Sequence, residues 1–497
     1  MNIKPTGFIP ETGLIFERSQ PGRQGVCFPL VDVPETELPA EMCRSELNLP
    51  EVSELEMVRH FTRLSQKNFA IDIGFYPLGS CTMKYNPKIN DAMANLAGFQ
   101  DIHPYQDPST IQGALELMWE LQEWLGEIAG LPAVTLQPAA GAHGELTGAL
   151  IMRAYHESQG RRRKTILVPD SAHGTNPATA AMVGYDTKEL PTDANGNVEL
   201  NALREAMNED VAGLMITNPS TLGVFEENIL EVAEVIHSKG GLIYMDGANM
   251  NAMVGIARPG DFGMDILHYN LHKTMTVPHG GGGPGAGAIA VRADLARFLP
   301  VPLVSKADDG TDEGTFYFDY ERPDSIGRIR AFYGNFNNMV RAFVYMHILG
   351  KDGLVDMSQT AVLNANYIKE QLRGVYHLPF DRTCKHEVIF TSKWLKNKTS
   401  HLDHPVRTLD VAKRLLDYGI HAPTIYFPLT VEECMLIEPT ETESKQMLDH
   451  FVAVMKQIAQ EAEETPEMVT SAPHHAPITR LDEASAARRP DLRWRPT

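Results

Sequence analysis

The sequence predicts an α/β protein with a large, mostly parallel sheet domain followed by a smaller α+β domain. Short apolar runs of strand length occur at 165–169, 211–217 and 241–245. A helical apolar pattern at 226–238 separates the last two runs, and Gly240 behind it is a typical helix-ending residue. A strand, a helix and a strand at this spacing form a βαβ unit, whose two strands are parallel.

Length and composition narrow the class of protein. The chain has 497 residues, of which 43% are hydrophobic and 22% charged, as in ordinary globular enzymes. A chain of this length is too long to fold around a single hydrophobic core, so we expect at least two domains. The formal net charge of −20 argues against nucleic-acid and anionic membrane partners. Five scattered cysteines without a Cys-x-x-Cys pair, and no window of transmembrane length, favour a reducing, cytoplasmic location.

The other elements of the large domain follow from local patterns. Residues 110–130 predict a helix, which Ser109 or Thr110 would cap, because apolar side chains recur at spacings of three and four. The segment at 137–145 is followed by a second helical pattern that runs to about 156. Apolar runs at 265–271 and 286–291 predict two further strands.

Beyond about residue 300 the strand signals become weaker. Helices are expected near 335–349, 358–373, 408–418 and 441–462, and short strands at 387–391 and 424–427. The first residues are rich in Pro, Gly and Glu and predict an arm that packs on another surface. We therefore expect an arm (1–60), a large domain (61–300), a small domain (301–464) and an extended tail (465–497).

Reactive side chains follow two predicted strands at the ends where open α/β sheets bind ligands. Asp246 closes the run at 241–245, and Lys273 follows the run at 265–271. Pyridoxal phosphate requires such a pair: a lysine forms a Schiff base with its aldehyde, and an acid keeps its pyridine nitrogen protonated. A single lysine lies more often on the surface, but the pair together predicts this cofactor.

Other strand ends offer groups that suit the same cofactor. Gly141 and Ala142 precede a helix, whose free N–H groups favour a phosphate, although on this feature alone a plain tight turn is the better explanation. His173 has the ring to stack on a pyridine, and Thr221 has a hydroxyl to donate to the ring or the phosphate. As isolated residues, the histidine is more often structural and the threonine is ordinary turn chemistry.

Two further patterns resemble sites of other kinds. Gly280, Gly282 and Gly285 satisfy G-x-G-x-x-G, but they lead into a strand and not from a strand into a helix. We therefore expect no dinucleotide site and interpret the run as backbone that passes close to a cofactor or a neighbouring subunit. His268 and His272 are four residues apart, but no third ligand is evident, so we expect no metal site.

Long, ordered blocks between about residue 60 and about residue 455 carry a family resemblance. They are YPLGSCTMKYNP (76–87), SAHGTNPA (171–178), TNPSTLGVFE (217–226), DGANMNAMVG (246–255), YNLHKT (269–274), PHGGGGPG (278–285), HAPT (421–424) and IEPTETES (437–444). Together they resemble the P-protein of the glycine cleavage system, glycine decarboxylase. The family exists as one fused chain or as two subunits, and this chain has about half the fused length with the lysine block. It therefore resembles subunit 2 of the prokaryotic two-subunit form.

The resemblance implies a fold and a set of cofactor contacts. The fold would be the type I (aspartate aminotransferase-like) fold of pyridoxal phosphate enzymes, with Lys273, His173 and Asp246 as catalytic residues. Lys273 would bond to the cofactor, Asp246 would pair with its pyridinium, and His173 and Ala248 would cover its two faces. The residues expected near the phosphate are Gly141, Ala142, Thr221 and His272. His143 is included among the cofactor contacts, although it stands where the fused family has Gln, which leaves any ring contact of His143 open.

The resemblance also implies a reaction and its partners. Glycine would be decarboxylated, and its aminomethyl group would pass to the lipoyl arm of H-protein. The chain would assemble with subunit 1 as α₂β₂. The loop at 76–87 and residues 421–424 are candidates for shaping the glycine and lipoyl pocket. The alternatives are another pyridoxal phosphate decarboxylase, against which the GGGGPG and IEPTE blocks argue, and a noncatalytic scaffold, against which Lys273 and Asp246 argue.

Overall fold

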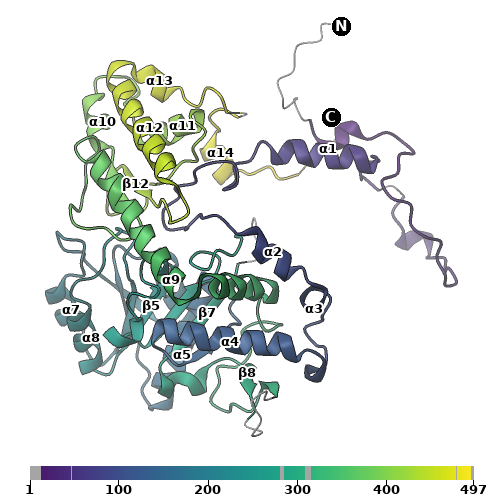
Figure 1. Ribbon diagram of the computed structural model, residues 1–497, viewed down its shortest axis with the longest axis horizontal. Coiled ribbons are helices and arrows are strands. Elements are labelled where there is room, and N and C mark those ends of the chain that lie inside the picture. Colours follow the sequence, from purple (N-terminus) through teal and green to yellow (C-terminus); the bar gives the residue numbers. More distant parts are fainter. Residues whose placement is uncertain (1–12, 46, 280–284, 308–314, 477, 494–497) are drawn as a thin grey trace. The chain divides into compact units, whose positions relative to one another are not determined.

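The computed structural model describes residues 13–45, 47–279, 285–307, 315–476 and 478–493 (Figure 1). The chain forms two compact units, Met1–Ile73 and Gly74–Thr497. The glycine pattern at Gly280 and Gly282 lies outside the described residues. Within the described ranges, no helix has the length and apolar content that crossing a lipid bilayer requires.

The first unit contains little regular structure in its described part. It holds the 3₁₀ turns η1 (Ile15–Arg18) and η2 (Ala40–Met42) and the helix α1 (Glu54–Ser65). A capping box starts α1, in which the Ser53 side chain accepts the Glu56 N–H and the Glu56 side chain accepts the Ser53 N–H. In the described part of this unit most large apolar side chains are exposed, Leu30 by 98%, and they form no core of their own. An arm that packs on another surface stays a prediction.

The second unit is built around a seven-stranded sheet in the order β1-β7-β6-β5-β4-β2-β3. Strands β2 to β6 pair in parallel, and β7 runs antiparallel to both β6 and β1. The strands are β1 (Ala133–Thr135), β2 (Thr165–Pro169), β3 (Asp186–Leu190), β4 (Val211–Thr217), β5 (Leu242–Gly247), β6 (Ile266–Asn270) and β7 (Gly287–Val291). The mostly parallel sheet is confirmed, and β2 and β4 have the predicted bounds. Neither β1 nor β3 was predicted.

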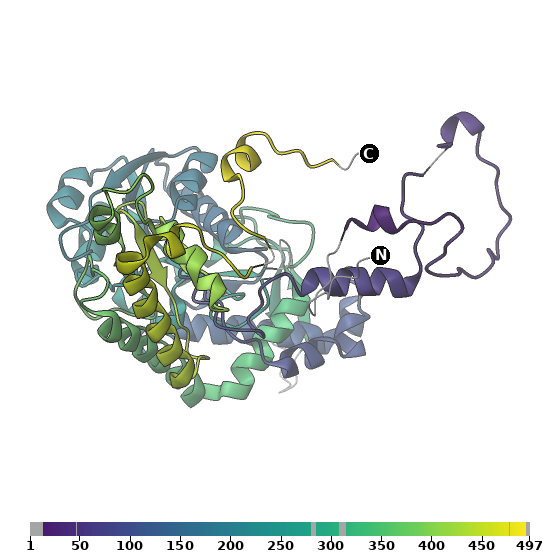
Figure 2. The same ribbon diagram turned by 90° about the horizontal axis from the view of Figure 1, so that it is seen from above.

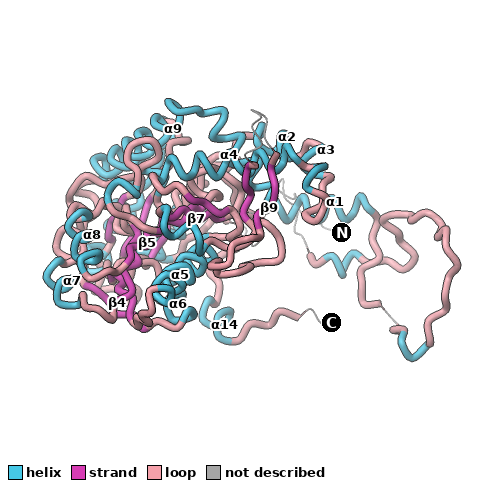
Figure 3. Tube along the Cα trace, turned by 90° about the horizontal axis from the view of Figure 1, so that it is seen from below, coloured by secondary structure: helices cyan, strands magenta, loops and turns pink. Residues whose placement is uncertain are grey.

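Helices cover both faces of this sheet (Figure 3). One face carries α5 (Gly141–Ser158) and α6 (Thr175–Val183), and the other carries α4 (Gln112–Ala129), α7 (Leu200–Ala206) and α8 (Ile229–Ser238). Side chains alternate between the faces: Leu242 and Tyr244 belong to the core beneath α5, whereas Ile243 and Met245 belong to the core beneath α4 and α8. This explains why the strands appear in the sequence as continuous apolar runs.

The predicted helix ends are confirmed in one case and wrong in another. Gly240 follows the last residues of α8 with φ of 71°, in the left-handed region that glycine favours. Ser109 and Thr110 do not cap α4. They belong to the preceding turn η3 (Pro108–Thr110), where the Ser109 N–H and hydroxyl donate to Asp107 Oδ1 at 2.9 and 2.8 Å.

The residues after 300 add a hairpin and a second sheet. The hairpin pairs β8 (Leu303–Lys306) with β9 (Phe316–Asp319). The second sheet is antiparallel in the order β10-β12-β11, formed by β10 (Val388–Thr391), β11 (Thr424–Ile425) and β12 (Cys434–Ile437). Its helices are α10 (Lys393–Lys398), α11 (Thr408–Asp417) and α12 (Lys445–Glu464), and α12 (yellow in Figure 2) contacts α9 (Phe336–Leu372). Antiparallel strands with helices agree with the predicted α+β character, and the domain boundary near 300 stays a prediction.

Two helical predictions differ in detail from the structure. The helices expected at 335–349 and 358–373 form one element, α9, which is interrupted at Gly350 (φ 59°, ψ −171°). The tail expected to be extended contains α13 (Pro466–Thr470) and α14 (Glu483–Arg488), and α13 contacts α12 through the buried Val469. The remaining short elements are α2 (Lys88–Ala94), α3 (Ala97–Gln100), η4 (Met250–Ala252), η5 (Pro259–Phe262) and η6 (Ala293–Phe298).

Candidate active site

A cavity of about 190 Å³ lies at the carboxyl ends of the central strands. Thr217 of β4, Asp246 of β5 and Asn270 of β6 all line it. Eight of the nine predicted site residues line the same cavity: Gly141, Ala142, His173, Thr221, Asp246, Ala248, His272 and Lys273. Lining residues that the sequence analysis did not single out for the cofactor are Ser80, Glu145, Thr175, Thr217, Asn249, His268 and Asn270. The predicted residues therefore lie together at one cavity.

Asp246 is buried and held in place by its neighbours. Its Oδ1 accepts the Ala248 N–H at 2.9 Å and lies 3.3 Å from His268 Nε2. The other ring nitrogen of His268 hydrogen-bonds to the Tyr244 hydroxyl. Burial lowers the pKa of His268, and the Asp246 carboxylate opposes that shift. The carboxylate of Asp246 therefore has a fixed orientation at the cavity wall.

The amine of Lys273 donates to the Ser80 carbonyl oxygen at 2.7 Å. Ser80 and Thr82 have φ values of 65° and 46°, in the left-handed region that side chains other than glycine disfavour. Two buried carboxylates hold this strained turn: Ser80 N–H donates to Glu387 Oε2 at 2.7 Å, and Thr82 N–H donates to Glu438 Oε2 at 2.9 Å. The turn that contacts Lys273 is thus anchored from the second sheet.

Glu387 and Glu438 form a buried cluster with His386, and all three side chains are 0% exposed. One ligand atom from each lies within 4.8 Å of the others, as in sites that hold a metal ion. Burial raises the pKa of Glu438 to about 7 and, together with the Glu438 charge, raises that of Glu387. Burial lowers the pKa of His386 to about 3. Both carboxyls therefore keep a proton to higher pH than an exposed glutamate does, and the histidine favours its neutral form.

The start of α5 forms part of the cavity wall, through Gly141 and Ala142. Ala140 at its N-cap makes no side-chain cap hydrogen bond. Gly141 packs so closely on Asn270 that a Cβ there would lie 2.3 Å from Asn270 Oδ1. Asn270 Oδ1, Asn249 Oδ1 and Thr217 Oγ1 are buried atoms of the cavity residues that have no hydrogen-bond partner in the described part of the chain. A ligand in the cavity would therefore meet unpaired acceptor and donor groups.

The other predicted residues have these places. His173 Nδ1 lies 2.8 Å from Thr175 Oγ1. His272 Nδ1 lies 3.1 Å from the Ala286 carbonyl oxygen, and burial lowers its pKa to about 3. The Thr221 hydroxyl donates to the Ser171 carbonyl, so it presents only its oxygen lone pairs to a ligand.

His143 does not line the cavity. Its Nδ1 accepts the Ala139 N–H at 3.1 Å, which turns the ring back on the chain before α5. His143 follows Gly141 and Ala142 in the sequence, but its side chain does not reach the cavity that they line, because successive residues of a helix point in different directions.

The two segments proposed to shape a substrate pocket lie together. The Tyr76 and His421 rings stack at a centroid distance of 3.8 Å and an angle of 17°. Thr424 Oγ1 donates to the Gly79 carbonyl oxygen at 2.7 Å. These two contacts hold the part of the loop just before Ser80 against residues 421–424.

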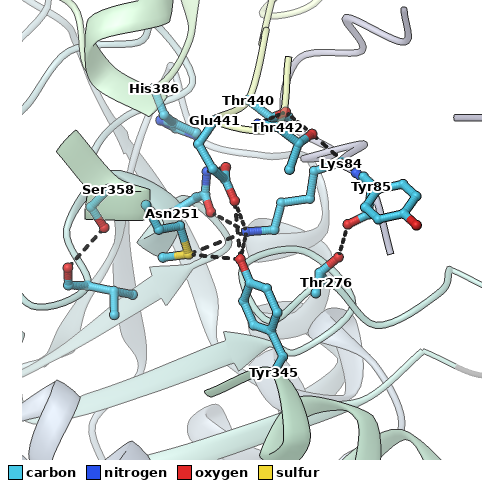
Figure 4. Close-up of polar contacts among 12 residues, drawn as sticks. Lys84, Tyr85, Asn251, Thr276, Tyr345, Ser358, His386, Thr440, Glu441 and Thr442 are labelled. Carbon is cyan, nitrogen blue, oxygen red and sulfur yellow. Dashed lines mark hydrogen bonds and ion pairs between the residues drawn. The ribbon is translucent and has the colours of Figure 1, made fainter. Parts of the chain in front are cut away.

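A second cluster surrounds Lys84 of the same loop (Figure 4). Its amine contacts Glu441 Oε1 at 2.7 Å, Asn251 Oδ1 at 2.8 Å and the Tyr345 hydroxyl at 3.3 Å. Burial is the largest single influence on the pKa of Lys84 and lowers it, but the Glu441 carboxylate and the Tyr345 hydroxyl together outweigh burial and leave the pKa raised. Lys84 is thus held as a buried cation that joins four separate segments.

A larger cavity, of about 450 Å³, lies elsewhere and is mainly apolar. Phe99, Leu115, Met118 and Phe318 are among the residues that line it. None of the predicted site residues lies there. Reactive side chains gather in the smaller cavity, which is therefore the candidate active site.

Solved structures share the fold of this chain. A glycine decarboxylase (P-protein) of the glycine cleavage system, in inhibitor-bound form, superposes with a TM-score of 0.71 at 22% identity, covering 85% of this chain and 93% of that chain. A cysteine desulfurase from Thermococcus onnurineus NA1 superposes with a TM-score of 0.59 at 16% identity, covering 78% and 95%. At these identities the likeness shows the fold, which is the type I fold of pyridoxal phosphate enzymes.

Sequence relatives cover almost the whole chain. A probable glycine dehydrogenase (decarboxylating) subunit 2 from Caldanaerobacter subterraneus subsp. tengcongensis is 56% identical over 487 residues, which are 97% of this chain and 98% of that one. The chain of the same description from Bacillus cytotoxicus is 55% identical over 490 residues, with the same coverage. The family described as glycine dehydrogenase, C-terminal domain, matches residues 357–478, and the glycine cleavage system P-protein family matches residues 29–402. The chain therefore belongs to the glycine cleavage system P-protein family.

Proposed function

We propose that this chain is the subunit of a glycine cleavage system that decarboxylates glycine on pyridoxal phosphate and transfers the aminomethyl group to lipoylated H-protein. Lys273 and Asp246 in one cavity carry the proposal, because they are the two groups this cofactor chemistry requires. The family assignment makes the chain a pyridoxal phosphate-dependent glycine decarboxylase. The transfer to H-protein goes beyond it and rests on the resemblance.

The cavity residues fit the cofactor in three respects. An amine and a buried carboxylate line the same cavity, so both functional ends of a pyridine ring have a partner. The start of α5 offers a phosphate its backbone N–H groups and helix dipole. Thr217 Oγ1 and Asn270 Oδ1 are buried polar atoms that need a hydrogen-bond partner. The threonine hydroxyl could donate to an oxygen of the cofactor, and the amide oxygen could accept a hydrogen bond from a protonated group of the ring.

The roles of the residues follow from their contacts. When bound, pyridoxal phosphate supplies a ring that accepts electrons from the carbon that loses carbon dioxide. Asp246, held by Ala248 and His268, would keep a proton on the ring nitrogen. Lys273 would be the attachment point, and it exchanges its Ser80 contact for the cofactor. His173 and Ala248 would cover the ring, and Gly141 and Ala142 would bind the phosphate, with Thr221 and His272 beside it.

The substrate and partners complete the proposal. The anchored turn at Ser80 and the Tyr76–His421 stack would shape the space for glycine and the lipoyl disulfide. The sequence relatives are named as a second subunit, which supports an α₂β₂ assembly with subunit 1. We also propose a cytoplasmic location, which the five free cysteines fit, since such thiols suit a reducing compartment.

The test is an assay of the chain co-expressed with subunit 1. We expect carbon dioxide release from glycine that depends on oxidised, lipoylated H-protein, and borohydride should fix the cofactor onto Lys273, as peptide mapping would show. Faster release from a larger amino acid without a lipoyl acceptor would make the chain a different decarboxylase. If the assembly takes up no cofactor, the chain is a scaffold and the proposal fails.

A further inference from the structure

Three side chains form a hydrogen-bonded line along the cavity wall that ends at a buried acid, Glu145. His173 Nδ1 lies 2.8 Å from Thr175 Oγ1, and Thr175 Oγ1 lies 2.7 Å from Glu145 Oε1. Glu145 belongs to α5, whereas Thr175 opens α6 and His173 precedes it. All three line the cavity, so the sequence-distant helices α5 and α6 build one hydrogen-bonded line at its wall.

The hydroxyl of Thr175 is able to carry a proton along this line in either direction. A hydroxyl has one proton and two lone pairs, so it donates to one neighbour while it accepts from the other. With Glu145 ionised, His173 Nδ1–H donates to Thr175, which donates to the carboxylate. With Glu145 protonated, the acid donates to Thr175, which donates to Nδ1. The Thr175 N–H also donates to His173 Nδ1 at 3.3 Å, a contact that the second state keeps and the first gives up. The state of Glu145 therefore shifts the balance between the two nitrogens of His173, and Nε2 is the nitrogen left for a ligand in the cavity.

The surroundings of Glu145 allow both of its protonation states near neutral pH. Burial raises its pKa to about 7, with a further contribution from Asp246, while the Thr175 and Thr179 hydroxyls and the Lys273 amine oppose the shift. Tyr244 of β5 also faces it from the sheet. Burial also lowers the pKa of His173, which the Asp246 charge opposes and Lys273 reinforces. Neither end of the line is therefore locked in one state.

We propose that Glu145 is a positioning residue that stores a proton for His173 through the Thr175 hydroxyl during turnover. The inference rests on the proposed function, whose proton transfers such a store would serve. One proton must leave the ammonium group of glycine before its nitrogen joins the cofactor. One proton must reach the sulfur that is released when the aminomethyl carbon bonds to the other sulfur and the disulfide opens. His173 would take up the first proton and deliver the second, and Glu145 would hold it in between.

The matched test compares Thr175→Val with Thr175→Ser in the assembly with subunit 1. Valine keeps the shape of threonine but breaks the line, whereas serine keeps the hydroxyl. We expect kcat to fall by about 100-fold in Thr175→Val, within the range for general acid–base groups, and by no more than about threefold in Thr175→Ser. Thr179→Val is the control, because Thr179 contacts Glu145 at 3.4 Å but lies outside the line to His173.

Glu145→Gln tests the store itself, since an amide has the shape of the acid but does not release a proton. In the wild type, kcat should change with pH near pH 7, where Glu145 ionises. This change should be absent in the variant. A second readout needs no turnover: diethyl pyrocarbonate modifies the neutral His173 ring, and peptide mass mapping follows its extent against pH. The wild-type curve should show the ionisation of Glu145 as well as that of His173, and Thr175→Val should show that of His173 alone.

The outcomes separate this inference from the proposed function. Identical His173 modification curves in the wild type, Thr175→Val and Glu145→Gln would overturn the relay, as would an unchanged kcat in Thr175→Val. An inactive wild type would instead overturn the proposed function, and the modification curves would still decide whether the line exists. If Thr175→Val does not fold, the Glu145→Gln curve decides alone.

Discussion

Lys84 and Glu441 form an ion pair of 2.7 Å in which the two side chains are only 1% and 10% exposed. The pair joins the loop at 76–87 to the segment after β12, and Asn251 and Tyr345 complete it (Figure 4). A buried charge that loses its oppositely charged partner strongly destabilises the folded protein. The pair therefore holds in place the loop that contains Ser80, the residue that contacts Lys273.

Replacement of Lys84 by Met should destabilise the protein by about 3–5 kcal/mol, because it leaves the Glu441 carboxylate buried without its cation. The midpoint of urea denaturation would measure the loss. Lys445→Met is the control: Lys445 pairs with Asp449 at 2.7 Å on the surface, with both side chains well exposed, so the loss should stay below about 1 kcal/mol. Equal midpoints for the two variants would contradict a structural role of the buried pair.

The pH dependence of stability should report Glu438. Its pKa is raised from 4.5 to about 7 in the folded protein, so the folded state binds more protons than the unfolded chain in this window. Its contribution to stability is complete below about pH 4.5 and is lost as the pH rises through about 7. Glu438→Gln should reduce the difference in stability between the two ends of the window by roughly 2–3 kcal/mol. Denaturation midpoints across the window would show it. Glu463→Gln in α12, which removes only an exposed ion pair with Lys398, should change the stability by less than about 1 kcal/mol.

Gly141→Ala should weaken cofactor binding. The new Cβ would lie 2.3 Å from Asn270 Oδ1, so the start of α5 would have to move away from the cavity wall. Overpacking of this kind costs about 1–3 kcal/mol, which corresponds to roughly fivefold to 100-fold in the dissociation constant. Titration of the visible cofactor band measures the constant. Gly113→Ala in α4 is matched, because its Cβ would meet no atom within 4 Å, and a similar loss there would refute the steric explanation.

Asp246→Asn should separate cofactor binding from turnover. The amide keeps the size of the carboxylate but does not hold a proton on the ring nitrogen, so we expect kcat to fall by about 100-fold or more. Borohydride should still fix the cofactor onto Lys273 in this variant. Unchanged turnover would remove Asp246 from its proposed role, while loss of cofactor uptake would show that it acts in binding.

Local pattern predicted the sheet where the strands are buried on both faces. β2 and β4 have the predicted bounds because a parallel strand between two helical layers is apolar throughout. β3 was missed because four of its five residues are exposed and the segment DTKEL has no apolar run. β1 was missed because it has only three residues. Neither strand has a signal that any window of sequence could distinguish from a loop.

The sequence by itself determined which groups stand at the strand ends, and so brought Asp246, Lys273 and six other predicted residues to one cavity. That succeeds because the carboxyl ends of parallel strands meet at one edge of a sheet. Only the tertiary structure decided where the side chains from distant segments meet. The contact between Thr82 and Glu438 spans 356 positions, and that between Thr175 and Glu145 depends on how α6 packs on α5. Hydrogen bonds are short and directional, so pairs of this kind exist only once the packed layers have set the distances between them.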